Sequence, residues 1–282
     1  MIRSRNAPGF TLLELSIVLS IIALVVGAVI IGQDIMRSTR LQSIVSDFGN
    51  YTKAIQLFKE KYHALPGDMP DAESFWGSDN SCPSTPWTAP YSYPHIPTCN
   101  GDGNGHIGDS DTSGNLTNTL EWWRAWQQLV NAGFIQAPVN GIIGGTDLAH
   151  TRQPQYAVVA GGYTNVPASQ VTGAGWTLNY FLLTTNASNT SLWADRYGHL
   201  LNFGAQNGYS YTTGAVLTPA EALSLDAKID DGMPGTGQIR AWRTSLLANC
   251  TNETNPHNTQ NTAIYNTSYT SAACALVFLL GF

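Results

Sequence analysis

The hydrophobic positions near the amino terminus follow two successive patterns. Residues 15–31 are almost all apolar, and a helix that is apolar on every side is buried on every side. No proline occurs between Thr11 and His63, so we expect one long helix, apolar over residues 10–32 and amphipathic over residues 33–64. In the second part, large apolar residues recur every three or four positions and predict a face that packs on a globular head: Leu41, Ile44, Val45, Phe48, Tyr51, Ile55, Phe58 and Tyr62.

Residues 65–282 have the composition of a globular head. Residues 65–117 are rich in Pro, Gly, Ser and Asp, so we expect irregular structure there. A second helix is predicted over residues 118–132, with Asn118 as its N-cap and Gly133 after its last turn. Its expected core face consists of Trp122, Trp126, Leu129 and Val130, with Trp123 on the flank.

A third helix is predicted to begin after Thr218, where Thr218 and Glu221 form a capping-box pattern, and to end near Ile229. Within residues 150–282, strand composition predicts a mixed strand region, with candidate strands at residues 155–160, 177–185, 200–203, 238–243 and 273–282. The predicted fold class is therefore α+β, with a long amino-terminal helix packed on a β-containing head that carries two extra short helices.

The apolar run is long enough to cross a membrane. Residues 10–32 span roughly 33 Å as a helix, and a hydrocarbon core is about 30 Å thick. Arg3 and Arg5 precede the run without any acidic residue, which places the amino terminus in the cytoplasm. A secretory signal would be cleaved after its apolar core, but Ala23 and Ala28 do not form such a site. An ordinary membrane anchor is the alternative.

The start of the run carries a specific motif, Gly9-Phe10-Thr11-Leu12-Leu13-Glu14. Together with the apolar stretch to about residue 31, this motif resembles the amino terminus of type IV prepilins and the related pseudopilins. The resemblance implies a pilin-like fold and cleavage between Gly9 and Phe10 by a membrane prepilin peptidase. That step would remove residues 1–9, and Phe10 would become the N-methylated first residue.

Glu14 is the one charged residue between Arg5 and Asp34. A carboxylate at the edge of a membrane segment is costly without a partner and tends to be functional. In a helical assembly, the Glu14 carboxylate could pair with the new Phe10 amine of a neighbouring subunit. Each charge would offset the desolvation of the other, so a misplaced subunit would leave a buried ion unpaired.

The overall composition bears on the function class. Of 282 residues, 11% are charged, and the formal charge of −6 becomes −8 once the two leader arginines are lost. An acidic subunit does not favour nucleic-acid binding, which relies on clustered Lys and Arg. The chain contains no nucleophile elbow, P-loop, HExxH or Rossmann glycine pattern, and its six histidines are scattered. We therefore expect no enzymatic activity.

Four cysteines allow three pairings. For an exported protein we expect two local disulfides, Cys82–Cys99 and Cys250–Cys274, with free buried thiols as the alternative. The pilin resemblance adds to this expectation, since many type IV pilins close a carboxy-terminal loop with a disulfide.

Residues 100–111 resemble a twelve-residue calcium loop of the EF-hand or dockerin kind. In such loops, oxygen ligands occupy positions 1, 3, 5, 7 and 12, and a glycine occupies position 6. The corresponding candidate ligands are Asn100, Asp102, Asn104, His106 and Asp111, with Gly105 at the sixth position. Asn at the first position and Asp at the last predict weak, millimolar affinity; a solvated turn is the alternative. A second acidic cluster, Asp226, Asp230 and Asp231, is expected to be merely solvated.

The resemblance implies a structural function. The leading hypothesis is a type IV pilin-like subunit that leaves the inner membrane and joins an extracellular filament for adhesion or motility. Its partners would be a prepilin peptidase and methyltransferase, copies of itself, other pilins and an inner-membrane assembly platform. The main alternative is a pseudopilin of a type II secretion system in a periplasmic pseudopilus. A surface binding module that uses the prepilin segment only as an anchor is the third reading.

Overall fold

The computed structural model of the chain consists of two compact units, Met1–Gln42 and Ser43–Phe282. It describes residues 11–79, 97–108, 120–139, 164–183, 193, 195–207, 211–242, 248–253 and 261–282. Several predicted features lie outside these residues, among them the leader at residues 1–9, the N-cap Asn118 and the strand at residues 155–160.

Helix α1, Leu12–Tyr62, is continuous, as predicted. It ends where His63 adopts a left-handed backbone conformation with φ of 56°. Every large apolar side chain between Leu12 and Met36 is more than half exposed. Among the residues that the structure describes, α1 is the single helix long and apolar enough to cross a membrane.

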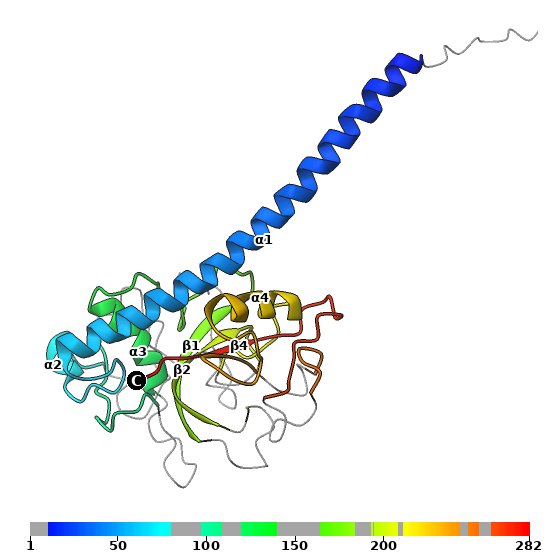
Figure 1. Ribbon diagram of the computed structural model, residues 1–282. Helices are drawn as coiled ribbons and strands as arrows, with labels where there is room; N and C mark the ends of the chain where they lie inside the picture. Colours follow the sequence, from blue (N-terminus) through cyan, green and yellow to red (C-terminus); the bar gives the residue numbers. More distant parts are fainter. Residues whose placement is uncertain are drawn as a thin grey trace, which may run out of the picture. The chain divides into compact units, whose positions relative to one another are not determined.

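The head contains a four-stranded antiparallel sheet in the order β1-β2-β4-β3 (Figure 1). Its strands are β1 Gly175–Leu183, β2 Arg196–Gly204, β3 Ile239–Ala241 and β4 Leu276–Leu279. Each lies within or overlaps a range predicted from composition. The last strand of the chain pairs with both β2 and β3, so the two middle positions of the sheet belong to β2 and β4.

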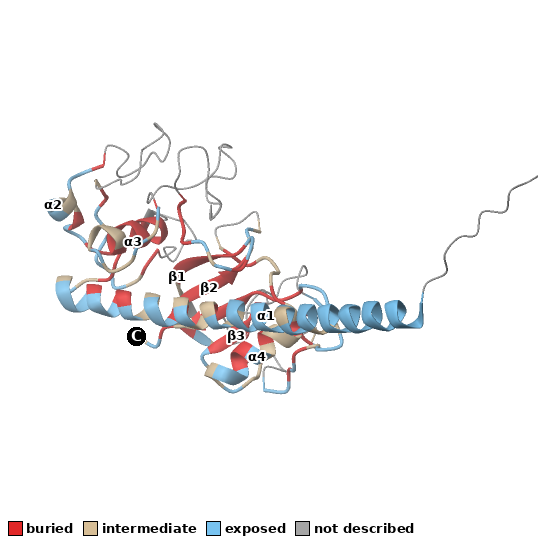
Figure 2. Cartoon of the chain, turned by 90° about the horizontal axis from the view of Figure 1, so that it is seen from above, coloured by how far each residue is buried: buried red, intermediate tan, exposed pale blue. Residues whose placement is uncertain are grey.

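The core of the head lies between the second half of α1, helix α3 and one face of the sheet. The ring of Phe48 on α1 lies 4.9 Å from that of Phe278 on β4, measured between centroids. Tyr51 contacts Trp126 of α3 and Trp176 of β1, with centroid distances of 5.0 and 5.8 Å. Figure 2 shows the strands and α3 as the most buried elements. The predicted apolar face of α1 therefore does pack on the head.

Within the described part of the head, three short helices accompany α1, where the sequence predicted two. They are α2 Ala72–Trp76, α3 Leu120–Asn131 and α4 Pro219–Ile229. α2 lies in the segment predicted to be irregular. Its Glu73 N–H donates to Asn100 Oδ1 at 2.8 Å, and Trp76 packs on Tyr62 with ring centroids 5.4 Å apart. Both contacts are non-local, so the local composition did not reveal this helix.

The predicted start of α4 and the predicted glycine after α3 are confirmed. At α4, the Thr218 hydroxyl accepts from Glu221 N at 3.3 Å and the Glu221 carboxylate accepts from Thr218 N at 2.9 Å, which confirms the capping box. After α3, Gly133 has φ of 78°, a conformation that favours glycine.

Helix α3 is buried on more than its apolar face. Trp123, expected on the flank, is fully buried. Arg124 is buried as well, and its guanidinium donates to the Asp79 carboxylate at 2.8 Å, with side-chain exposures of 1% and 0%. Gln128 Oε1 accepts from Gly67 N at 2.7 Å. The polar side chains of α3 thus hold the segment that follows α1 and the segment around Asp79.

Candidate functional sites

The first candidate site is the amino-terminal end of α1. Glu14 Oε2 accepts hydrogen bonds from Thr11 N at 2.8 Å and from the Thr11 hydroxyl at 2.9 Å. In return, the Thr11 hydroxyl accepts from Glu14 N at 3.2 Å. This reciprocal arrangement is a capping box that satisfies backbone N–H groups of the first turn. The sequence Thr11-Leu12-Leu13-Glu14 therefore has the capping-box signature in addition to its place in the prepilin-like motif.

The capping box fixes the position of the Glu14 carboxylate. Both bonds from Thr11 go to Oε2, and within the described residues no partner is recorded for Oε1. The carboxylate therefore lies at the positive end of the helix dipole with one oxygen available to a further cation. The predicted cleavage residues, Gly9 and Phe10, lie outside the described residues.

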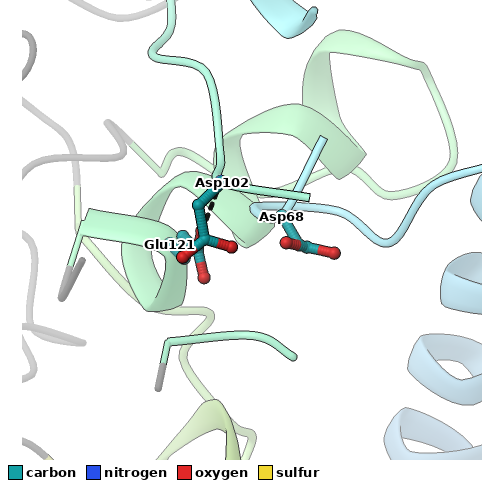
Figure 3. Close-up of side chains that lie close together, drawn as sticks. All are labelled: Asp68, Asp102 and Glu121. Carbon is teal, nitrogen blue, oxygen red and sulfur yellow. Dashed lines mark hydrogen bonds between the residues drawn. The ribbon is translucent and has the colours of Figure 1, made fainter. Parts of the chain in front are cut away.

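The second candidate site is a cluster of three carboxylates in the head. Asp68 follows α1, Asp102 lies in the loop of residues 101–108, and Glu121 lies in the first turn of α3. One oxygen of each lies within 4.8 Å of the others. Figure 3 shows the Asp68 carboxylate facing those of Asp102 and Glu121. We call these three residues the carboxylate cluster.

Backbone amides of the loop reach two of these carboxylates. Glu121 accepts from Asp102 N at 3.0 Å and from Gly108 N at 2.7 Å, one bond on each oxygen. Asp68 Oδ2 accepts from Gly105 N at 3.0 Å. The loop can approach this closely because of its glycines. A Cβ at Gly108 would overlap the Trp122 indole, and φ of 70° there also favours glycine.

Burial raises the pKa of two members of the cluster. Burial, the main cause, raises the pKa of Glu121 to about 8; the Gly108 and Asp102 amides lower it, and the nearby Asp102 and Asp68 charges raise it further. The pKa of Asp68 rises to about 6, again chiefly through burial, with a contribution from Asp102. In the absence of a cation, the packing of this cluster is therefore unfavourable to the charged forms of Asp68 and Glu121.

The structure distributes the predicted calcium-loop ligands differently from the twelve-residue pattern. Asp102 belongs to the carboxylate cluster, and its Oδ2 accepts from Asn104 Nδ2 at 3.0 Å. Asn100 Oδ1 instead accepts from Glu73 N of α2. The His106 ring stacks on Tyr180, with centroids 3.8 Å apart. The twelfth position, Asp111, lies outside the described residues.

Asp68 and Glu121 were not among the predicted ligands. Asp68 belongs to the turn that ends α1, and Glu121 belongs to the first turn of a helix, so each has an ordinary local explanation. Only the folding of three separate segments brings them to Asp102. The one sequence signal was an acid beside a glycine in each of two Gly/Asp turns, at residues 67–68 and 101–102.

The carboxylates of the second acidic cluster accept hydrogen bonds mainly from the turn that follows α4. Asp226 accepts from Gly232 N at 3.1 Å and from the Tyr265 hydroxyl at 2.8 Å. Asp231 accepts from Met233 N at 2.8 Å and from the Thr236 hydroxyl at 2.6 Å, and Asp230 accepts from Gln238 N and Ile239 N. These carboxylates organise the turn after α4, which gives them a structural role beyond solvation.

The cysteines follow the predicted scheme where they are described. Cys250 and Cys274 form a disulfide with a Cα–Cα distance of 5.0 Å, which confirms that prediction. Cys99 is also disulfide-bonded, and its predicted partner, Cys82, lies outside the described residues.

Comparison with known proteins finds one family. Residues 4–30 match the model of the prokaryotic N-terminal methylation motif. No curated protein and no solved structure matches the chain. The match covers Gly9, Phe10 and Glu14, and α1 continues from it as one helix. The chain therefore carries the prepilin-type amino terminus shared by type IV pilins and pseudopilins, as its sequence resemblance indicated.

Proposed function

We propose that this protein is a type IV pilin-like structural subunit that is held in the inner membrane by α1 and then assembled into an extracellular filament. A prepilin peptidase cleaves it between Gly9 and Phe10, and Phe10 is N-methylated. The same apolar surface of α1 serves as a membrane anchor before assembly and as filament core afterwards. The head, joined to α1 through Phe48 and Tyr51, forms the exposed part of the filament.

The observation that carries this proposal is the position of Glu14. It is the single charge in an apolar segment whose side chains are exposed, and the methylation motif surrounds it. Thr11 holds its carboxylate at the start of α1 through Oε2. In the assembled filament, Glu14 Oε1 accepts a hydrogen bond from the methylated Phe10 ammonium of a neighbouring subunit. The pair stabilises correct register because either charge alone in an apolar filament core is costly.

The test compares two substitutions on α1. Glu14→Ala removes the proposed partner of the amine, whereas Glu60→Ala removes an exposed acid from the head half of the same helix. The full chain is expressed in cells that lack the natural copy. Mass spectrometry then gives the mature amino terminus, and the sheared surface fraction gives the amount of filament.

We expect both variants to be inserted and cleaved between Gly9 and Phe10, and only Glu14→Ala to be missing from filaments. Normal filaments built from the Glu14→Ala chain alone would contradict the pairing. An unprocessed natural chain that retains residues 1–9 would contradict the prepilin assignment itself.

The same material separates a pilin from a pseudopilin. A pilin is recovered in sheared appendages, and its loss abolishes adhesion or surface movement. A pseudopilin of a type II secretion system stays in the cell envelope, and its loss blocks export of secreted enzymes. We expect the first pattern; the second would replace the pilin proposal with the pseudopilin one.

A further inference from the structure

The carboxylate cluster contains a buried oxygen without a hydrogen-bond partner. Asp68 is 3% exposed, and its Oδ2 accepts from Gly105 N, but its Oδ1 has no partner. A buried polar atom without a partner is unusual and costs free energy. The Asp68 carboxylate faces those of Asp102 and Glu121 (Figure 3). Three acidic side chains thus converge, and one of them has a buried oxygen without a partner among the described residues.

We propose that Asp68, Asp102 and Glu121 bind one calcium ion. The donors that the three side chains contribute are all carboxylate oxygens, the ligands that hard divalent cations take. Asp102 is exposed, so water can complete the coordination sphere on that side. Calcium accepts six to eight oxygens in flexible geometry, whereas magnesium requires a near-ideal octahedron. Three carboxylates from three separate segments suit the more tolerant ion.

An ion can reach this site from solvent. A cleft of about 330 Å³ is lined by Asp68, Gly103 and Gly105, together with His63 and Lys59 at the end of α1. The cleft therefore reaches the Asp68 residue of the carboxylate cluster. Access of this kind is required of a site that exchanges its metal.

The bound ion would join three parts of the head. Asp68 belongs to the segment that leaves α1, Asp102 to the loop of residues 101–108, and Glu121 to α3. The loop is already tied to Glu121 and Asp68 through its own amides. Calcium would stabilise the folded head because the unfolded chain does not bring these ligands together. Its expected effect is thus on the stability of the head, independent of assembly.

The test measures calcium binding to the full chain in detergent after metal is removed with EDTA. Titration calorimetry gives stoichiometry and affinity, and differential scanning fluorimetry gives Tm with EDTA, with 10 mM calcium or with 10 mM magnesium. We expect one calcium ion per chain and a rise in Tm of roughly 5 °C. Magnesium should produce a clearly smaller rise.

Substitutions assign the ligands. Asp68→Asn keeps an acceptor for Gly105 N–H and replaces the unpartnered oxygen with an uncharged group. We expect it to weaken calcium binding at least tenfold while melting no lower than the natural chain in EDTA. Asp102→Asn, at an exposed position, should weaken calcium binding to a similar extent. If Asp68→Asn does not fold, Asp102→Asn still tests the site. Asp231→Asn, in the second acidic cluster, should keep the full calcium response.

Three results would overturn the proposal. The first is the absence of binding heat and of any Tm change at 10 mM calcium. The second is an equal rise in Tm with magnesium and with calcium, which would show that the site does not select calcium. The third is unchanged calcium affinity in both Asp68→Asn and Asp102→Asn, which would place the ion elsewhere.

Discussion

Phe48 on α1 packs against Phe278 on β4, with ring centroids 4.9 Å apart and ring planes 37° from parallel. One residue belongs to the amino-terminal helix and the other to the last strand. Trp176 of β1 lies 5.3 Å from the same Phe278 ring. The second half of α1 is thus a structural part of the head, and the core is incomplete without it.

This packing predicts that Phe48→Ala destabilises the head by about 3–5 kcal/mol, through lost burial and the cavity left beside Phe278. Gln56→Ala, at an exposed position of the same helix, should change stability by no more than about 0.5 kcal/mol. Urea unfolding followed by tryptophan fluorescence measures both. Equal stability of the two variants would show that α1 contributes little to the core.

The long helix and the capped helix could be predicted because their signals are local. The absence of proline and the three- and four-residue spacing indicated α1, and Thr218 with Glu221 marked the start of α4. The pairing of Arg124 with Asp79 could not be predicted, since 45 residues separate them. The carboxylate cluster could not be predicted for the same reason, since its three residues are far apart in the sequence. Periodicity describes one element at a time, whereas these contacts depend on how elements fold together.

The calcium-loop hypothesis illustrates the same limit at one residue. Its register assigned Asn100 the first ligand position, but the Asn100 side chain accepts from the first turn of α2. That helix was itself not predicted, because contacts that are distant in sequence hold it: Glu73 N–H donates to Asn100, and Trp76 packs on Tyr62. Because α2 was not predicted, Asn100 was assigned as a calcium ligand when its side chain in fact binds the first turn of α2.

The Cys250–Cys274 disulfide closes the segment that leads into β4. Replacing both cysteines with alanine should lower the free energy of unfolding by about 2–4 kcal/mol, since the unfolded chain regains freedom. Urea unfolding of the double variant without reductant measures this disulfide separately from the one at Cys99. A free energy of unfolding within about 0.5 kcal/mol of the natural value would indicate that the backbone hydrogen bonds of Cys250 and Cys274 suffice.

Thr11 should influence assembly through its hydrogen bonds to Glu14. Thr11→Val keeps the shape of the side chain but removes the hydroxyl, whereas Thr11→Ser keeps the hydroxyl. If Glu14 must be held at the helix end, Thr11→Val should lower the filament yield several-fold and Thr11→Ser should not. Mass spectrometry of the cleaved amino terminus checks that processing is equal in both. Equal yields from the two variants would show that the capping box does not position Glu14 for assembly.

Asp226 should make the stability of the head depend on pH. It is fully buried, and burial is the main cause that raises its pKa to about 7, while its bonds from the Tyr265 hydroxyl and Gly232 N–H oppose the rise. The unfolded side chain has a pKa of about 4. The folded chain therefore binds the extra proton, and this contribution to stability is present below pH 4 and is lost as pH rises through 7.

Asp226→Asn tests this directly, because the amide imitates the protonated carboxyl at every pH. Its oxygen can accept from Gly232 N–H while its NH₂ donates to the Tyr265 hydroxyl. Between pH 5 and pH 8, in EDTA, the natural chain should lose of the order of 2 kcal/mol more stability than the variant. The comparison subtracts the titration of Asp68 and Glu121, which both chains share. Parallel stability curves for the two chains would mean that Asp226 stays ionised in the folded head, with its charge fully stabilised by Tyr265 and Gly232.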